Sequence, residues 1–219
     1  MSRKVLVIDV GGTHVKILAS GKRAHREFES GPKLTPRAMV KGVKELAADW
    51  KYDAVSIGYP GPVRKGRPAR EPWNLGRGWL RFDFRRAFGV PVRIVNDAAM
   101  QALGSYRGGR MLFLGLGTGL GSALVVDGVL APLELAHLAY RHGNSYEHYL
   151  GAQGLRQRGP RRWRESVRDV VAQFVQAFQV DYVVLGGGNA KRLPALPPHA
   201  RRGHNELAFR GGFELWKER

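Results

Sequence analysis

The chain of 219 residues is long enough for one large core or two smaller lobes. Lysine and arginine outnumber aspartate and glutamate by 36 to 18, a formal net charge of +18. Such a surface attracts polyanions, although a solvated basic surface without a partner is an open alternative. The absence of cysteine excludes disulfides and cysteine-based zinc sites. No apolar stretch reaches the ~20 residues that span a bilayer, so we expect no membrane partner and a cytoplasmic location.

The first half of the chain opens with a strand, a glycine turn and a second strand. Thr35 followed by Pro36 is typical of a helix start, because a hydroxyl caps the helix and proline fits its first turn. In chain order we expect strands at 5–10, 15–19 and 25–29, a helix from 36 to about 50, a strand at 54–59, an ordered loop at 64–81, a strand at 90–95 and a helix at 98–106.

The same order restarts in the second half, which suggests an internal duplication and two related lobes facing a cleft. We place the first lobe at residues 1–97 and the second at 98–219, with the option that the last helix packs back on the first lobe. The expected elements are strands at 111–116 and 122–126, a hairpin turn at Asp127-Gly128, helices at 146–157 and 163–178, and a strand at 182–185.

Glycine-rich turns are the first candidates for chemistry, because their N–H groups can approach a phosphate closely. Gly11 and Gly12 follow Asp9, whose carboxylate can hold Mg²⁺ through water. A plain hairpin turn is the alternative. The stretch 115–121 carries four glycines and Thr118, which favours phosphate binding over a structural bulge. It lacks the Lys-Ser/Thr of a Walker A loop, and a strand follows it where a dinucleotide fold has a helix.

Three further groups of residues complete the candidate site. Asp97 ends a strand and can accept a proton from a substrate hydroxyl, but it can equally cap the helix that begins at residue 98, and both roles can hold. The triple glycine at 186–188 admits a phosphate chain or simply forms a turn. Polar side chains suited to sugar hydroxyls are Asn74, Glu134, His137 and Glu147. A metal at Glu134 and His137 would lack a third ligand.

Taken in order, these residues resemble the ROK family of sugar kinases, within the actin, hexokinase and Hsp70 ATPase superfamily. The ordered set is Asp9-x-Gly11-Gly12-Thr13, Gly58-x-Pro60-Gly61, Asn74-Leu75-x-x-x-Trp79, Asn96-Asp97-Ala98, the turn 115–121, Glu134-x-x-His137 and Gly186-Gly187-Gly188. Within the family, the stretches 149–163, 181–193 and 196–216 are similar to the polyphosphate glucokinase branch, which also lacks the cysteine zinc motif. One departure is Ala136, where the family usually has glycine.

The resemblance implies an α/β chain with the two-lobed, ribonuclease H-like fold of the actin and hexokinase ATPases. It implies a glucokinase in which Asp97 is the base that takes a proton from the sugar 6-hydroxyl, with Mg²⁺ near Asp9 and no zinc. The implied sugar-binding residues are Asn74, Asn96, Asp97, Glu134, His137 and Glu147. The implied donor-binding residues are Asp9, Gly11, Gly12, Thr13, Lys16, Gly117, Thr118, Gly119, Gly187, Gly188 and Asn189. A homodimer is expected from the family.

The donor is predicted to be inorganic polyphosphate, ATP or both. A basic track would hold polyphosphate by counterion release, and its candidates are Arg64, Lys65, Arg67, Arg70, Lys191, Arg192, Arg201 and Arg202. The alternatives are a strictly ATP-dependent glucokinase, a kinase for mannose or glucosamine, and a non-catalytic sugar- or polyanion-binding protein. A ROK-type repressor is disfavoured because eight residues precede Asp9. Nucleic-acid binding is disfavoured because aromatic stacking platforms are few.

Overall fold

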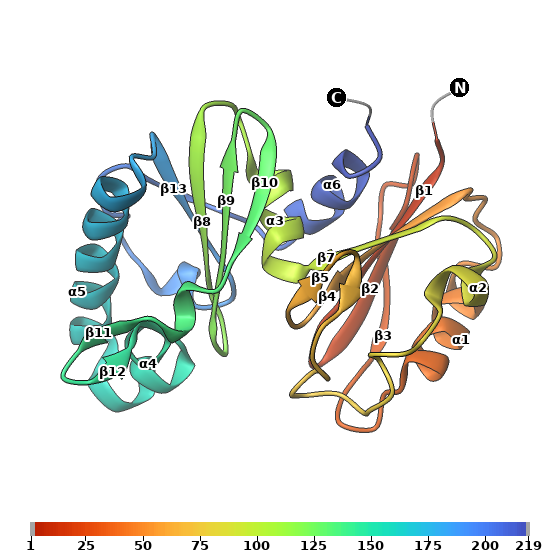
Figure 1. Ribbon diagram of the computed structural model, residues 1–219, viewed down its shortest axis with the longest axis horizontal. Helices are drawn as coiled ribbons and strands as arrows, with labels where there is room; N and C mark the ends of the chain where they lie inside the picture. The colour runs from red at the N-terminus through yellow and green to blue at the C-terminus, as the bar shows by residue number, and fades with distance from the viewer. Residues whose placement is uncertain (1–2, 218–219) are drawn as a thin grey trace. The chain divides into compact units, whose positions relative to one another are not determined.

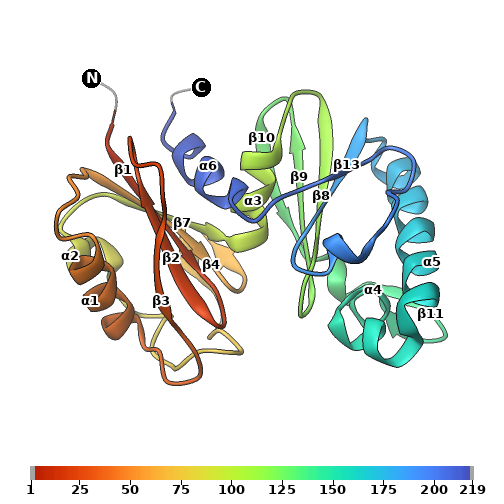
Figure 2. The same ribbon diagram turned by 180° about the vertical axis from the view of Figure 1, so that it is seen from behind.

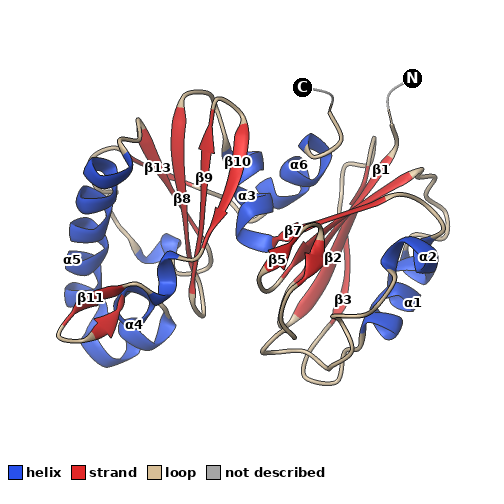
Figure 3. Ribbon diagram, viewed as in Figure 1, coloured by secondary structure: helices blue, strands red, loops and turns tan. Residues whose placement is uncertain are grey.

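The computed structural model describes residues 3–217 and divides the chain into two compact units. Unit 1 runs to Met100 and resumes at Ala208, whereas unit 2 comprises Gln101–Leu207. Each unit contains one five-stranded sheet with helices packed against it, together with a small two-stranded hairpin (Figure 1, Figure 3). By contact, therefore, the last helix belongs with the first unit rather than the second.

The sheet of unit 1 has the order β3-β2-β1-β4-β7. β1 is antiparallel to β2 and parallel to β4, and β4 is parallel to β7. The carboxyl ends of β1, β4 and β7 therefore meet at one edge, where ligands bind in open α/β sheets. The strands are β1 (Val5–Val10), β2 (His14–Ala19), β3 (Arg26–Glu29), β4 (Ala54–Tyr59) and β7 (Val92–Asn96).

Helices cover both faces of this sheet. The helix α1 (Pro36–Leu46) is capped as predicted, since Thr35 Oγ1 accepts a hydrogen bond from Ala38 N–H at 3.3 Å. It shares a core with α2 (Phe84–Phe88), which the sequence analysis missed, and with Leu6, Ile8 and Ile57 of the sheet. On the other face, Val5 and Val7 pack against Met100 of α3 (Asp97–Ser105) and against Ala208 and Phe209 of α6 (Leu207–Glu214).

A buried polar contact fixes α6 to unit 1. The Ser56 hydroxyl, which is fully buried in β4, donates to Gly212 O at 2.6 Å and accepts from Trp216 Nε1 at 2.8 Å. The Trp216 ring also lies beneath the guanidinium groups of Arg3 and Arg93. A β-carbon on Gly212 would overlap Val7, so glycine is required where the helix meets β1.

Unit 2 repeats the connectivity of unit 1, which confirms the predicted duplication. Its sheet has the order β10-β9-β8-β13-β14, again an antiparallel meander followed by two parallel strands. The hairpin turn at Asp127 and Gly128 is confirmed, with φ of 48° and 79°. The strands are β8 (Arg110–Leu116), β9 (Leu120–Val126), β10 (Val129–Leu133), β13 (Tyr182–Gly186) and β14 (Ala200–Arg202).

One long helix, α5 (Ala152–Phe178), lies alongside β13, as both views show (Figure 1, Figure 2). Its stripe of Trp163, Val167 and Val170 is fully buried against the sheet. Gly159, at φ 74° before Pro160, kinks the helix. The remaining elements are η1 (Leu135–His137), β11 (Ala139–Arg141), β12 (Asn144–Ser145), α4 (Tyr146–Leu150) and η2 (Ala190–Arg192).

Three sequence expectations were wrong in detail, the first being the helix expected from 36 to about 50, which ends at Leu46. The helix expected at 146–157 breaks at Gly151, because the next N–H, that of Ala152, donates to the carbonyls of Gly117 and Thr118 and not within α4. The loop expected at 64–81 contains a small hairpin, β5 (Val63–Arg64) with β6 (Arg67–Pro68). Between residues 3 and 217, no helix has the length and apolar character needed to cross a membrane.

Candidate active site

Asn96, not Asp97, caps the helix α3. Asn96 Oδ1 accepts from the N–H groups of Ala98 at 2.9 Å and Ala99 at 3.2 Å, which is the geometry of an N-cap residue. Asp97 is the first helical residue, with Oδ1 2.7 Å from Ala98 N. The expectation that Asp97 caps this helix is therefore corrected, because its neighbour already fills the position. The half-buried Asp97 carboxylate stands at the positive end of the helix, where a negative charge is stabilised.

Asp9 lies at the same edge of the unit 1 sheet, paired in register with Lys16 on β2 and Gly58 on β4. Burial and the negative charge of Asp97 raise the pKa of Asp9 to about 7, against a smaller lowering by Lys16. Gly58 makes room for this arrangement, since a β-carbon there would overlap the Met100 methyl and lie 3.5 Å from Asp9 Oδ1. Two carboxylates thus share one edge of unit 1.

The first glycine turn is closed on itself and faces Asn74. Gly11 N–H donates to His14 O at 2.9 Å, and a β-carbon on Gly11 would lie equally close to that oxygen. Ser30 Oγ, which the sequence analysis missed, donates to Gly11 O at 2.7 Å. A β-carbon on Gly12 would meet the Asn74 side chain at 3.3 Å. The structure thus brings Gly12 and Asn74 together, whereas the Thr13 hydroxyl is exposed and lies 3.2 Å from His14 Nδ1.

Polar contacts hold the loop that carries Asn74. The Glu71 carboxylate accepts from the N–H groups of Gly78 and Trp79, each at 3.1 Å. Tyr59 Oη donates to Arg70 O at 2.8 Å, and the Trp79 ring is fully buried. A loop anchored at several points presents its side chains to a ligand at low entropic cost.

In unit 2, the two remaining glycine motifs meet. Asn189 Nδ2 donates to Gly117 O at 3.1 Å, and Asn189 N–H donates to Leu116 O at 2.9 Å. Gly187, at φ 79°, lies so close to the Leu116 backbone that a β-carbon would come within 2.6 Å. The predicted donor residues of the turn 115–121 and of the triple glycine therefore form one surface of unit 2.

At two positions of this surface, neither the packing nor the backbone conformation of the protein requires glycine. A β-carbon on Gly117 or Gly188 would meet nothing within 4 Å, and neither residue has a positive φ. Within residues 3–217, the N–H groups of Thr118 and Gly119 donate no hydrogen bond. Open space and free donors beside a turn are what an approaching phosphate chain requires.

The predicted sugar residues of unit 2 occupy different positions. Glu147 is half-buried, and its Oε2 accepts from Leu120 N–H at 3.0 Å, so it contacts the glycine turn. Glu134 precedes η1 and His137 ends it, both with exposed side chains, and neither side chain forms a hydrogen bond within residues 3–217. Ser122, missed by sequence reasoning, fixes their backbone by accepting from Leu135 N–H and donating to Leu133 O. Ala136, the departure from the family pattern, is buried in the core.

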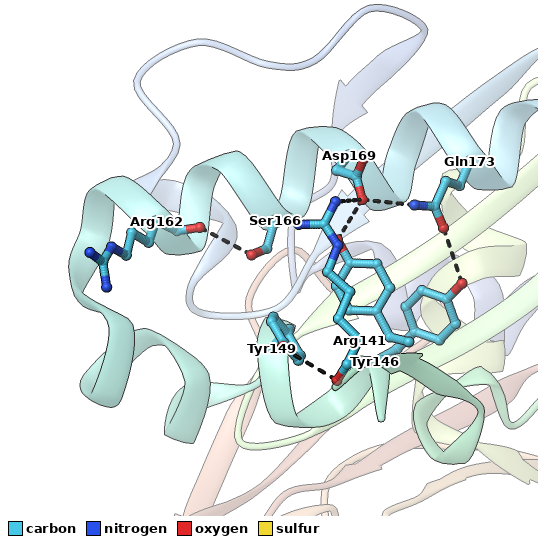
Figure 4. Close-up of polar contacts among 8 residues, drawn as sticks. Arg141, Tyr146, Tyr149, Arg162, Ser166, Asp169 and Gln173 are labelled. Atoms are coloured by element: carbon cyan, nitrogen blue, oxygen red, sulfur yellow. Dashed lines mark hydrogen bonds and ion pairs between the residues drawn. The ribbon is translucent and has the colours of Figure 1, made fainter. Parts of the chain in front are cut away.

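A polar cluster ties the β11–β12 hairpin and α4 to α5 (Figure 4). Asp169 Oδ2 accepts from Tyr140 Oη at 2.5 Å, Arg141 Nη2 at 3.0 Å and Gln173 Nε2 at 2.7 Å. Tyr146 Oη lies 3.2 Å from Gln173 Oε1. This cluster, the Asp169 cluster, orients the segment that lies between His137 and Glu147 in the chain.

The predicted basic track divides between the units. In unit 1, Arg64, Lys65 and Arg67 are exposed on the β5–β6 hairpin, with Arg70 further along. In unit 2, Lys191 and Arg192 are exposed on η2, whereas Arg202 donates to the carbonyls of Ala190 and Leu193 and so has a structural role. Arg201 is exposed, with its guanidinium 4.4 Å from the centre of the Tyr182 ring.

The donor set at Asp9 fits a magnesium ion held mostly by water. No cluster of three or more potential metal-ligating side chains occurs in the described part of the chain, 3–217. Mg²⁺ commonly uses only one or two carboxylates together with water and substrate phosphates. The negative field of Asp97, which contributes to the raised pKa of Asp9, would be relieved by such a cation.

The chain is similar to sugar kinases of known sequence and structure. A model of the ROK family matches residues 5–132, more than half of the chain. A polyphosphate glucokinase of Mycobacterium tuberculosis (strain CDC 1551 / Oshkosh) is 26% identical over 208 residues, covering 84% of this chain and 77% of that protein. A glucokinase of Pyrobaculum calidifontis is 28% identical over 172 residues, covering 73% and 52%. The polyphosphate/ATP-glucomannokinase of Arthrobacter sp. strain KM superposes with a TM-score of 0.80 at 24% identity, over 97% of both chains.

Together with the fold, these findings define the class of protein. The duplicated sheet and the structural likeness to sugar kinases confirm the actin-like ATPase fold that the sequence predicted. The chain belongs to the ROK family, and it is a sugar kinase near the polyphosphate glucokinase branch of that family.

Proposed function

We propose that the protein is a glucokinase that transfers a phosphoryl group from polyphosphate, ATP or both to the 6-hydroxyl of glucose. The observation that carries the proposal is the edge of unit 1, where Asn96 caps α3 and Asp97 stands beside Asp9. The half-buried Asp97 carboxylate follows the carboxyl end of β7 directly, at the start of α3. A carboxylate is the group needed to accept the hydroxyl proton in phosphoryl transfer.

In the proposed reaction, Asp97 takes the proton of the sugar 6-hydroxyl while that oxygen attacks the terminal phosphorus. The bond from phosphorus to the bridging oxygen of the donor breaks, and the leaving phosphate carries away the negative charge. Mg²⁺ near Asp9, when bound, would supply charge neutralisation. Asn74, Asn96, Glu134, His137 and Glu147 are proposed to orient the sugar through its hydroxyls.

The donor would lie against the glycine turns. Gly117 and Gly188 leave open space, and the N–H groups of Thr118 and Gly119 are available to phosphate oxygens. Gly11, Gly12, Thr13 and Lys16 are the proposed donor contacts of unit 1, and Gly119, Gly187 and Asn189 complete those of unit 2. A formal net charge of +18 supports a polyanionic donor.

An assay with the purified protein, Mg²⁺ and glucose tests the proposal, with ATP or long-chain polyphosphate as donor and glucose 6-phosphate as readout. We expect product with at least one donor, and with polyphosphate as a good one. Product with neither donor, for glucose or mannose, would refute the proposed function.

A second acceptor is suggested by one further likeness. The N-acetylmannosamine kinase of Salmonella newport (strain SL254) is 31% identical over 141 residues, which cover 57% of this chain. The same assay with N-acetylmannosamine and glucosamine would rank acceptors by kcat/KM. A homodimer stays a prediction, which light scattering on the purified protein checks.

A further inference from the structure

Both the Glu147 side chain and the glycines of the turn 115–121 contribute to the contact between them. Glu147 Oε2 accepts from Leu120 N–H at 3.0 Å. A β-carbon on Gly119 would overlap the same carboxylate, so the sequence leaves room for it there. A hydrogen bond from a backbone N–H to a carboxylate is stronger than one between neutral groups. Sugar binding alone does not require this arrangement.

The backbone around Glu147 is itself fixed against the turn. Ser145 Oγ caps α4 by accepting from His148 N–H at 3.4 Å. Gly151 N–H donates to Glu147 O at 2.8 Å, and the next N–H, that of Ala152, donates to the carbonyls of Gly117 and Thr118. The turn is therefore contacted twice, by the Glu147 carboxylate of α4 and by the N–H of Ala152, the first residue of α5.

We propose that Glu147 is a positioning residue for the phosphoryl donor, which latches the turn 115–121 in its phosphate-receiving conformation. The inference rests on the proposed kinase function, because that function assigns the turn to the donor. A turn with four glycines loses much conformational entropy when it is ordered, and an anchor at Leu120 N–H offsets part of this cost. The latch leaves the N–H groups of Thr118 and Gly119 free for phosphate.

Three substitutions at one position test the latch by kinetics. Glu147→Ala removes the acceptor and Glu147→Asp withdraws it, whereas Glu147→Gln keeps an oxygen that can accept from Leu120 N–H. For ATP and for long-chain polyphosphate, we expect the donor KM to rise about tenfold in the Ala and Asp variants and much less in the Gln variant. Glu165→Ala, on the exposed face of α5, is the control and should match wild type.

A sugar-only role for Glu147 would give the opposite pattern. All three variants would then raise the KM for glucose and leave the donor KM unchanged, which would overturn the latch. A rise in donor KM that Gln rescues supports it, whatever happens to glucose affinity. Gly119→Ala tests the same contact from the side of the turn, because the added methyl group would displace the Glu147 carboxylate. Combined with Glu147→Ala, it should add little further loss if both act on one contact.

Hydrogen exchange decides the latch without any activity. In the donor-free protein, amides of the peptide 116–121 should exchange faster in Glu147→Ala than in wild type, with Glu147→Gln in between or equal to wild type. Equal exchange in wild type and Glu147→Ala would overturn the proposal. If wild type phosphorylated no sugar, the proposed function would fail, but this comparison would still report on the contact.

Discussion

At the scale of single residues, the environment of Asp9 and Asp97 determines the chemistry. Sequence reasoning located both carboxylates, but it left Asp97 divided between base and cap. Only the observed hydrogen bonds of Asn96 decide the cap, because two adjacent side chains that can both cap a helix are indistinguishable by pattern. The pKa of Asp9 depends on burial and on Asp97, which are distant in sequence and so invisible to local patterns.

The raised pKa of Asp9 predicts how stability varies with pH in the metal-free protein. The folded state holds this proton more tightly than the unfolded state, so wild-type stability should fall as pH rises from about 4 to about 7 and then level off. Asp9→Asn has no ionisable group at this position, so its stability should not fall in this way. The difference in the free energy of unfolding between Asp9→Asn and wild type should grow over the same pH range, to at most about 4 kcal/mol. Thermal unfolding in EDTA across pH measures the difference. Glu45→Gln, at an exposed ion pair with Lys41, should follow wild type, and an Asp9→Asn advantage independent of pH would contradict the account.

At the scale of elements, strands and glycine turns were predictable, and short elements held by tertiary contacts were not. The strands of the two meanders other than β10 follow from apolar runs or alternation and from turn residues, whereas no strand was predicted at Val129–Leu133. In contrast, α2, β14 and the β11–β12 hairpin are short, and their positions depend on side chains far away in sequence. The contact of Glu147 with Leu120 N–H was missed for the same reason, since Leu120 precedes Glu147 by 27 residues.

The Asp169 cluster should stabilise the β11–β12 hairpin. Asp169→Ala leaves Tyr140 Oη and Arg141 without their acceptor. We therefore expect the free energy of unfolding to fall by about 1–3 kcal/mol. Denaturant unfolding measures the loss, and hydrogen exchange should show it concentrated in residues 139–149. Glu165→Ala, at an exposed pair with Arg161 on the same helix, is the matched control. An unchanged hairpin in Asp169→Ala would show that the cluster is not structural.

A second element, α6, should depend on its buried hydroxyl. Ser56→Ala removes the donor to Gly212 O and the acceptor of Trp216 Nε1. We therefore expect the free energy of unfolding to fall by about 1–3 kcal/mol. Lys217→Ala, which breaks an exposed ion pair with Glu214, should cost almost nothing. Urea unfolding compares the two variants. Equal stability of both would mean that α6 is held by apolar contacts alone.

At the scale of the whole molecule, the sequence predicted the duplicated fold and the family, and it offered the return of the last helix to the first lobe as an option. The segment from Ala208 does pack with unit 1, and the sequence left this as an option because α6 looks like any short amphipathic helix. The net charge of +18 belongs to this scale, since it is spread over both units.

Charge predicts a salt response specific to the donor. The KM for polyphosphate should climb steeply between about 50 and 200 mM salt, because binding a polyanion releases counterions. The KM for glucose should stay nearly constant. The doubly substituted variant Arg64→Gln/Arg67→Gln tests one part of the track and should flatten the response, with Arg37→Gln on exposed α1 as a control. A flat response in wild type would argue against polyphosphate as the donor.

The substitution Asp97→Asn shows whether Asp97 acts as the base of this sugar kinase. The amide is nearly isosteric but cannot accept the proton. We expect turnover with glucose to fall by about 10²–10⁴-fold. The dissociation constant for glucose, measured by calorimetry, should stay within a few-fold of the wild-type value. Normal turnover in a folded Asp97→Asn protein would contradict the account.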